Sequence, residues 1–251
     1  MNIYETDKLL GEYLLFHYGT ATEILPESMG GGDALIYPVR CVTECIDARV
    51  LPRDARALDL GCAVGRSTFE LARIFESAVG IDFSQRFIDA AETIRRDGSL
   101  RYVRTDEGAL TTPLMARAPK GVDASRVAFE VGDAMALREG LGTFDVVLAA
   151  NLIDRLREPQ RFLAQLAALV RPRGQLVITS PYTWLEEFTP RENWLGGFER
   201  DGLRVTTRDG LQNALGRDFE LLTVKDLPFL IREHARKFQM SVAEATIWRR
   251  R

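Results

Sequence analysis

Small residues occupy alternate positions of the segment 59–65, which lies between an expected strand and an expected helix: Gly61, Ala63 and Gly65. Small side chains let a ligand approach the backbone, and the start of a helix presents unpaired N–H groups to it. A dinucleotide-binding loop would read G-x-G-x-x-G, but Ala63 and Arg66 break that pattern. The segment therefore predicts a cofactor loop that fits the nicotinamide type poorly, although a nicotinamide-dependent oxidoreductase stays an alternative at the level of the fold.

Polar side chains end or directly follow four successive expected strands, namely Asp59, Asp82, Asp133 and Asn151. Ligands of open α/β sheets bind outside the carboxyl ends of the strands, so these side chains would border one crevice. Asp82 stands where a carboxylate can accept hydrogen bonds from both hydroxyls of a ribose. Taken singly, each carboxylate is equally well explained as a strand-end cap. The ordered set, with one polar residue per strand, favours a cofactor that contains a nucleoside.

The elements that must position these residues alternate along the chain from residue 56. Short apolar stretches predict strands, and the amphipathic stretches between them predict helices. This alternation predicts an α/β fold with a Rossmann-like, doubly wound and mostly parallel sheet whose crossovers are right-handed. The strands are expected at 57–60, 78–82, 127–131, 144–150, 175–179, 219–224 and 245–248, and the helices at 67–75, 84–96 and 159–170.

Three segments depart from this alternation, and we expect them to be additions to a single domain that spans residues 1–251. Residues 1–55 are expected to form a helical cap, and residues 97–126 an inserted β-hairpin. The loop 180–202 is rich in aromatic residues, and long loops in compact domains are often functional. We expect the helical cap and this loop to close over a pocket.

Composition argues against several classes of protein. The 251 residues carry 33 Lys and Arg against 36 Asp and Glu, a net charge of −3, whereas nucleic-acid binders usually have a basic surplus. The sequence has no run of about 18 apolar residues, so no membrane-spanning helix is expected. With three cysteines and no signal-peptide pattern, we expect a cytoplasmic protein with free thiols. Two histidines and three cysteines are few for a metal site, so no metal is expected.

The segment 59–65 resembles the D-x-G-x-[GA]-x-G loop of class I methyltransferases, which use S-adenosylmethionine (SAM) and release S-adenosylhomocysteine (SAH). The resemblance implies that the loop cradles the methionine half of SAM, that Asp82 binds the ribose and that Asp133 accepts from the adenine amino group. Asn151 would lie beside the sulfonium and the acceptor, and Arg40 would bind the carboxylate, although a surface charge explains Arg40 equally well. The implied cofactor-binding residues are Arg40, Asp59, Gly61, Cys62, Ala63, Gly65, Asp82, Phe83, Asp133, Ala134 and Asn151.

A closer resemblance, to the methyltransferase module of ovothiol biosynthesis, extends over nearly the whole chain. It is carried by the strings at 4–19, 37–41 (YPVRC), 180–187 (SPYTWLEE) and 229–237 (FLIREHARK). That family methylates a ring nitrogen of 5-thiohistidine, also called 4-mercaptohistidine, to give ovothiol A. Many relatives carry the module behind a sulfoxide synthase, so the resemblance implies a functional link to such an enzyme and to a lyase. Here the module stands alone, which leaves the choice between a sulfur and a selenium substrate open.

Methyl transfer to an imidazole needs an aligned and unprotonated nitrogen, so positioning can supply much of the rate. An ionised thiol on the ring would make a strong general base unnecessary. Aromatic, polar and charged residues in the resembling strings are therefore the expected site residues. The catalytic candidates are Asn151, Tyr182 and His234, and the substrate-binding candidates are Tyr4, His17, Tyr18, Trp184, Arg232 and Glu233.

Structural explanations stand beside these roles. His17 also suits the C-terminal end of its helix, Tyr13 lies on an apolar stripe that favours core packing, and the charged run 232–234 is typical of a solvated face. Cys41 and Cys45, four residues apart, are better explained as core than as ligands. Other functions also stay open: a methyltransferase for histidine, histamine or a catechol-like acceptor, or a protein that binds SAM without chemistry.

Overall fold

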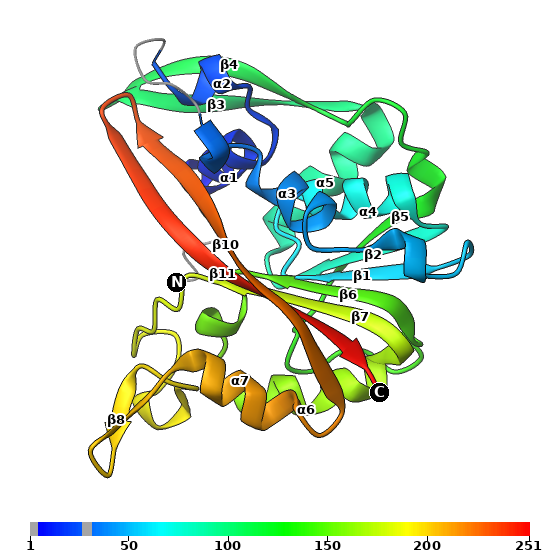
Figure 1. Ribbon diagram of the computed structural model, residues 1–251. Helices are drawn as coiled ribbons and strands as arrows, with labels where there is room; N and C mark the ends of the chain where they lie inside the picture. The colour runs from blue at the N-terminus through cyan, green and yellow to red at the C-terminus, as the bar shows by residue number, and fades with distance from the viewer. Residues whose placement is uncertain (1–4, 27–31) are drawn as a thin grey trace.

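A seven-stranded sheet forms the centre of the protein in the computed structural model, which describes residues 5–26 and 32–251 (Figure 1). The strand order is β10-β11-β7-β6-β1-β2-β5, and only β11 runs antiparallel to its neighbours. This arrangement confirms the predicted α/β fold with a mostly parallel sheet. The strands are β1 (Arg56–Leu60), β2 (Ser77–Asp82), β5 (Val127–Val131), β6 (Phe144–Ala150), β7 (Val170–Ser180), β10 (Phe219–His234) and β11 (Lys237–Arg250).

Helices cover both faces of the sheet, and on β6 the apolar side chains alternate between the faces. On β6, Val146 and Leu148 belong to one buried cluster, whereas Val147 and Ala149 belong to the other. This period of two is what a strand that is buried on both faces requires. One face carries α1 (Asp7–Tyr18), α2 (Ala21–Ile24), α3 (Tyr37–Thr43), α4 (Arg66–Ile74) and α5 (Gln85–Asp97), and the other carries α6 (Pro159–Leu169) and α7 (Thr207–Leu215) (Figure 1).

The segments that interrupt the alternation have structure of their own. Between α5 and β5, the strands β3 (Ser99–Glu107) and β4 (Leu110–Arg117) form an antiparallel hairpin that packs against α1. The aromatic segment after β7 contains a small hairpin of β8 (Phe198–Arg200) and β9 (Leu203–Val205). Short 3-10 helices lie at Gly32–Ala34, Ala48–Val50, Ala124–Arg126, Ile153–Arg155 and Arg191–Asn193.

The last two strands are much longer than the sequence predicts. Only 219–224 and 245–248 are expected as strand, yet β10 and β11 have 16 and 14 residues. Residues 244–249 of β11 pair with β7, whereas the rest of the hairpin continues past the sheet to contact α1, α3 and β3 (Figure 1). Charged residues and Pro228 hide this continuation in the sequence, because they break the apolar pattern that predicts a strand.

Arg232 of β10 forms hydrogen bonds and an ion pair with two other segments, α2 and the β3–β4 hairpin. Its guanidinium donates to the carbonyls of Glu23 and Ile24 at the end of α2, at 3.3 and 3.0 Å, and pairs with Asp106 of β3 at 3.1 Å. Only 7% of the residue is exposed, so the expectation of a solvated charge at this position is wrong. The arginine joins the β10–β11 hairpin to the N-terminal helices and to the β3–β4 hairpin.

We expect Arg232→Ala to lower the free energy of unfolding by about 2 kcal/mol, because it removes buried hydrogen bonds made by a charged group. Urea unfolding followed by circular dichroism measures this loss. Arg236→Ala is the matched control, since Arg236 is exposed near the tip of the same hairpin. Equal stability of the two variants would mean that the junction contributes little.

Candidate active site

The loop between β1 and α4 contains three residues with positive φ angles, which few residue types adopt readily. Gly61, Ala63 and Gly65 all have positive φ, at 73°, 48° and 85°. A Cβ on Gly65 would also lie 2.5 Å from Cζ of Phe129, so this position requires glycine for space as well as for its φ. The N–H groups of Gly61 and Cys62 both donate to the carbonyl of Ile81, at 2.8 and 3.1 Å, which fastens the loop to β2.

Asp82 holds this loop from the end of β2. One carboxylate oxygen accepts from the Ala63 N–H at 2.8 Å, and the other accepts from the Ser84 N–H at 2.9 Å. Each oxygen keeps a second lone pair that a ligand can use. Burial raises the pKa of Asp82, whereas the hydrogen bonds from Ser84 and Ala63 act in the opposite direction.

Asp59 lies deeper, on β1. It is 1% exposed, and its carboxylate accepts from the hydroxyl of Thr68 on α4 at 2.7 Å. Burial raises the pKa of Asp59 to about 7, and the nearby carboxylate of Asp82 adds to this rise. A positively charged ligand beside Asp59 would favour the ionised carboxylate.

A cavity of about 760 Å³ opens along the carboxyl ends of β1, β2, β5 and β6. The strand-end side chains therefore meet at one crevice, as the topology predicts. The cavity is lined by most of the residues that the sequence assigns to the cofactor: Asp59, Gly61, Cys62, Ala63, Asp82, Phe83, Asp133, Ala134 and Asn151.

Aromatic side chains from the N-terminal helices form another wall of the cavity. Tyr13, Phe16 and His17 come from α1, and Tyr37 comes from α3. Burial, together with the nearby Arg66, lowers the pKa of His17 to about 3, so its imidazole is uncharged at neutral pH. His17 Nδ1 is buried and makes no hydrogen bond with the described residues.

Arg40, which is expected to bind the cofactor, and Tyr18, which is expected to bind the substrate, both lie outside the cavity. Arg40 pairs with Glu44 at 2.6 Å and donates to the carbonyl of Pro228 at 2.9 Å, so its guanidinium binds α3 and β10. Tyr18 donates its hydroxyl to the carbonyl of Val64 at 2.7 Å. Tyr18 therefore contacts the loop after β1 and does not line the cavity.

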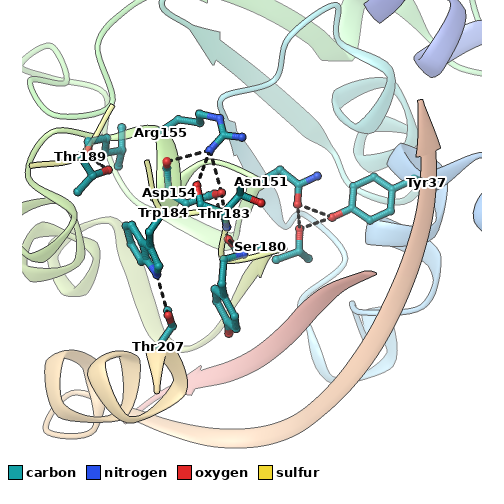
Figure 2. A network of polar contacts seen from close by, with 12 residues as sticks. Tyr37, Asn151, Asp154, Arg155, Ser180, Thr183, Trp184, Thr189 and Thr207 are labelled. Atoms are coloured by element: carbon teal, nitrogen blue, oxygen red, sulfur yellow. Dashed lines mark hydrogen bonds and ion pairs between the residues drawn. The ribbon is translucent and has the colours of Figure 1, made fainter. Parts of the chain in front are cut away.

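The aromatic residues expected after β7 are also placed elsewhere. Trp184 is 8% exposed in the core under the sheet, where its indole N–H donates to Thr207 on α7 at 2.8 Å (Figure 2). The Tyr182 hydroxyl donates to Glu244 of β11 at 2.7 Å. These partners lie 23 and 62 residues away along the chain, and local sequence does not reveal them.

The charged string on β10 does not line the cavity. Arg232 is the buried junction described above, and Glu233 pairs with Lys237 at 2.7 Å. His234 lies at the hairpin tip, where Nδ1 accepts from the Arg236 N–H at 3.3 Å. Tyr4 lies outside the described residues. Of the predicted substrate residues other than Asn151, the structure therefore places His17 alone at the cavity, within the described part of the chain.

The cavity also has walls that the sequence does not single out. Tyr37 belongs to the string 37–41, yet only the structure shows its hydroxyl beside Asn151. Charged residues of the segment after β6, together with Glu187, form one rim of the cavity. At this rim, the guanidinium of Arg155 lies 4.8 Å from the ring centroid of Phe188. These rim residues are Arg155, Arg157, Glu158, Arg161 and Glu187.

Residues 5–26 and 32–251 contain no group of three or more potential metal ligands. Cys41 and Cys45 are free thiols in the core, and burial raises the pKa of Cys45 to about 11. In the same part of the chain, no helix has the length and apolar character to cross a membrane.

Residues 58–176 match the family described as a methyltransferase domain. The O-methyltransferase cnsE of Penicillium expansum is 27% identical over 202 residues, which cover 79% of this chain and 64% of that protein. The ajmaline N-methyltransferase of Rauvolfia serpentina is 23% identical over 180 residues, covering 69% and 53%. The chain thus spans about half to two thirds of the length of these relatives.

Solved structures show the same fold. The [4+2]-cyclase SpnF superposes with a TM-score of 0.57 at 20% identity, over 98% of this chain and 97% of that chain. A SAM-dependent methyltransferase from Methanosarcina mazei gives a TM-score of 0.53 at 20% identity, over 80% and 95%. Residues 58–176 therefore match a methyltransferase domain, and the chain has the fold of solved SAM-dependent methyltransferase structures.

The buried Asp59 makes stability depend on pH. Its pKa of about 7 in the folded protein exceeds that of an unfolded chain, so the stabilisation of the protonated form is complete below about pH 4 and is lost as the pH rises through about 7. We expect the ligand-free wild type to lose about 3 kcal/mol relative to Asp59→Asn across this window. Urea unfolding at several pH values measures the difference.

Asp97→Asn is the control for this experiment. The hydrogen bond from Arg96 lowers the pKa of Asp97, so its contribution changes only at lower pH. A free-energy difference between wild type and Asp59→Asn that stays constant from about pH 4 to about pH 7 would contradict the assignment.

Proposed function

We propose that the protein transfers a methyl group from SAM to a nitrogen of a small heteroaromatic acceptor, with 5-thiohistidine as the substrate and ovothiol A as the product. The observation that carries the SAM assignment is the Asp82-anchored loop 61–65 at the mouth of β1, with Asp59 and Asp133 on the same cavity. The substrate assignment is supported by the sequence resemblance and by the aromatic wall.

The residues at the cofactor end fit SAM better than a dinucleotide. SAM carries a positive sulfonium and an ammonium group, and the carboxylates of Asp59 and Asp82 lie beside the loop without a basic side chain in residues 61–65. A pyrophosphate in the same place would be repelled by these carboxylates. The strand order also differs from that of dinucleotide-binding sheets, because β11 is inserted antiparallel between β7 and β10.

The residues of the chain then have distinct roles. The remaining lone pairs of Asp82 would accept from the ribose hydroxyls, Asp133 from the adenine amino group, and the loop would hold the methionine half. Phe83 is 67% exposed at the cavity and offers its ring as an apolar contact for the nucleoside. When bound, SAM supplies a methyl group on a positively charged sulfur.

At the acceptor end, the chain's own residues orient the substrate and exclude water. Tyr13, Phe16 and Tyr37 provide flat walls for a ring, and the uncharged His17 adds a polar edge without a competing charge. The acceptor nitrogen forms the new C–N bond with its lone pair while the S–CH₃ bond breaks and its electrons stay on sulfur. A ring that arrives as the thiolate has no proton to lose at that nitrogen, so alignment can account for much of the rate.

Incubation of the protein with SAM and 5-thiohistidine tests the substrate. We expect a mass increase of one methyl group and a ring N-methyl signal in the proton NMR spectrum, accompanied by release of SAH. The selenium analogue, histidine, histamine and a catechol tested in parallel would reveal a different acceptor. Methylation of one of these, with no ring N-methyl product from 5-thiohistidine, would replace the proposed substrate.

Asp82→Ala tests the cofactor assignment. Losing hydrogen bonds from a carboxylate costs about 1.5–3 kcal/mol, so we expect SAH to bind about tenfold to a hundredfold more weakly by calorimetry. Arg40→Ala is the matched control, because Arg40 lies outside the cavity and should leave SAH affinity unchanged. Unchanged affinity in Asp82→Ala, or binding of NAD(H) in place of SAH, would rule out the assignment.

A further inference from the structure

Three side chains from separate elements meet just beyond the end of β6. The Tyr37 hydroxyl on α3 donates to Oδ1 of Asn151 at 2.8 Å (Figure 2). The hydroxyl oxygens of Tyr37 and Thr179, which lies on β7, are 2.6 Å apart, and the Thr179 hydroxyl lies 3.5 Å from the same Oδ1. Two hydroxyl groups therefore converge on a single amide oxygen.

The backbone fixes Asn151 from a second direction. Its φ is 51°, in the left-handed region, and its N–H donates to the carbonyl of Thr179 at 2.8 Å. Asparagine tolerates this region better than most residues. The backbone hydrogen bond to Thr179 thus fixes the Cα of Asn151, and the hydroxyl groups of Tyr37 and Thr179 fix its amide oxygen.

This arrangement leaves the amide nitrogen free for a ligand. Asn151 lines the cavity, and the atom of its amide that Tyr37 contacts is the oxygen (Figure 2). Nδ2 makes no hydrogen bond with any described residue, whereas it carries two N–H donors and no lone pair. The group that faces the cavity is therefore a hydrogen-bond donor and cannot accept.

The part of the cavity wall that comes from α1 and α3 carries no charge. The cavity wall that α1 and α3 contribute consists of Tyr13, Phe16, His17, Tyr37 and Pro38. Burial raises the pKa of Tyr37 well above its ordinary value, so its hydroxyl keeps the proton that it donates to Asn151. The best hydrogen-bond partner for the Asn151 amide N–H is therefore a ligand atom with an available lone pair or an atom of a delocalised anion.

We propose that Tyr37 is a positioning residue that holds Asn151 as the hydrogen-bond donor to the acceptor. The acceptor is then a flat ring that presents an anionic or lone-pair atom beside its nucleophile. This inference rests on the proposed function and narrows its substrate class. A ring thiolate next to the methylated nitrogen has this chemistry, whereas a plain histidine ring lacks the additional acceptor atom.

A double-mutant cycle in the full-length protein tests the pairing with SAM and 5-thiohistidine. We expect Tyr37→Phe to lower kcat/KM about tenfold and Asn151→Ala to lower it at least as much. The double variant should lose no more than Asn151→Ala alone, because the hydroxyl acts only through the amide. Tyr102→Phe, a buried tyrosine on β3 outside the cavity, is the control and should match wild type.

SAH affinity separates this role from general damage to the fold, and it should change less than twofold in Tyr37→Phe. Additive losses in the double variant, or wild-type kinetics in Tyr37→Phe, would overturn the proposal.

A second measurement does not depend on turnover. The side-chain ¹H–¹⁵N signal of Asn151 is identified by its absence in Asn151→Ala, with SAH bound. We expect it to move in Tyr37→Phe but not in Tyr102→Phe, and to move more on addition of 5-thiohistidine than of histidine. If 5-thiohistidine gives no methylated product while the signal still moves in Tyr37→Phe, the proposed substrate fails and the positioning role stands. An unmoved signal in Tyr37→Phe would refute that role even in an active enzyme.

Discussion

The carboxylate of Asp82 fastens two backbone segments at once, the loop after β1 through Ala63 and the start of α5 through Ser84. The loop depends on this contact because it contains a non-glycine residue in the left-handed region, which is unfavourable without support. Since β1 and β2 are neighbours in the sheet, the Asp82 side chain at the end of β2 can reach the loop that follows β1. The floor of the cavity is consequently set by the pairing of adjacent parallel strands.

The meeting of the loop and the strand-end carboxylates at one cavity was predictable because its determinants are local. Small residues at 61, 63 and 65 and an acidic residue at the end of the next strand can be read without knowing the partners. The parallel topology then brings the strand ends together. The helices and core strands were predictable for the same reason, because apolar periodicity reports burial on one or both faces of an element.

The places of the other candidate residues were less predictable because their contacts are distant in sequence. Arg232 looks like a surface charge until the carbonyls at the end of α2 are placed against it. Trp184 looks like a pocket wall until Thr207 supplies a partner in the core. Tyr37 gains its significance only from Asn151, which lies 114 residues away. Residue type alone does not distinguish these cases, since the same side chains suit a core, a junction or a ligand.

The continuation of β10 and β11 past the sheet has a consequence for how substrate specificity can change. Ile231 of β10 lines the cavity, while Phe229 packs against Phe16 and Tyr37, with ring centroids 6.0 and 4.7 Å apart. This wall of the cavity is therefore assembled from segments near both ends of the chain, with the matched methyltransferase domain between them. In a chimera that exchanged the N-terminal helices alone, the new helices would not fit the side chains of β10 that pack against them. Evolution or protein engineering must therefore alter the two ends together.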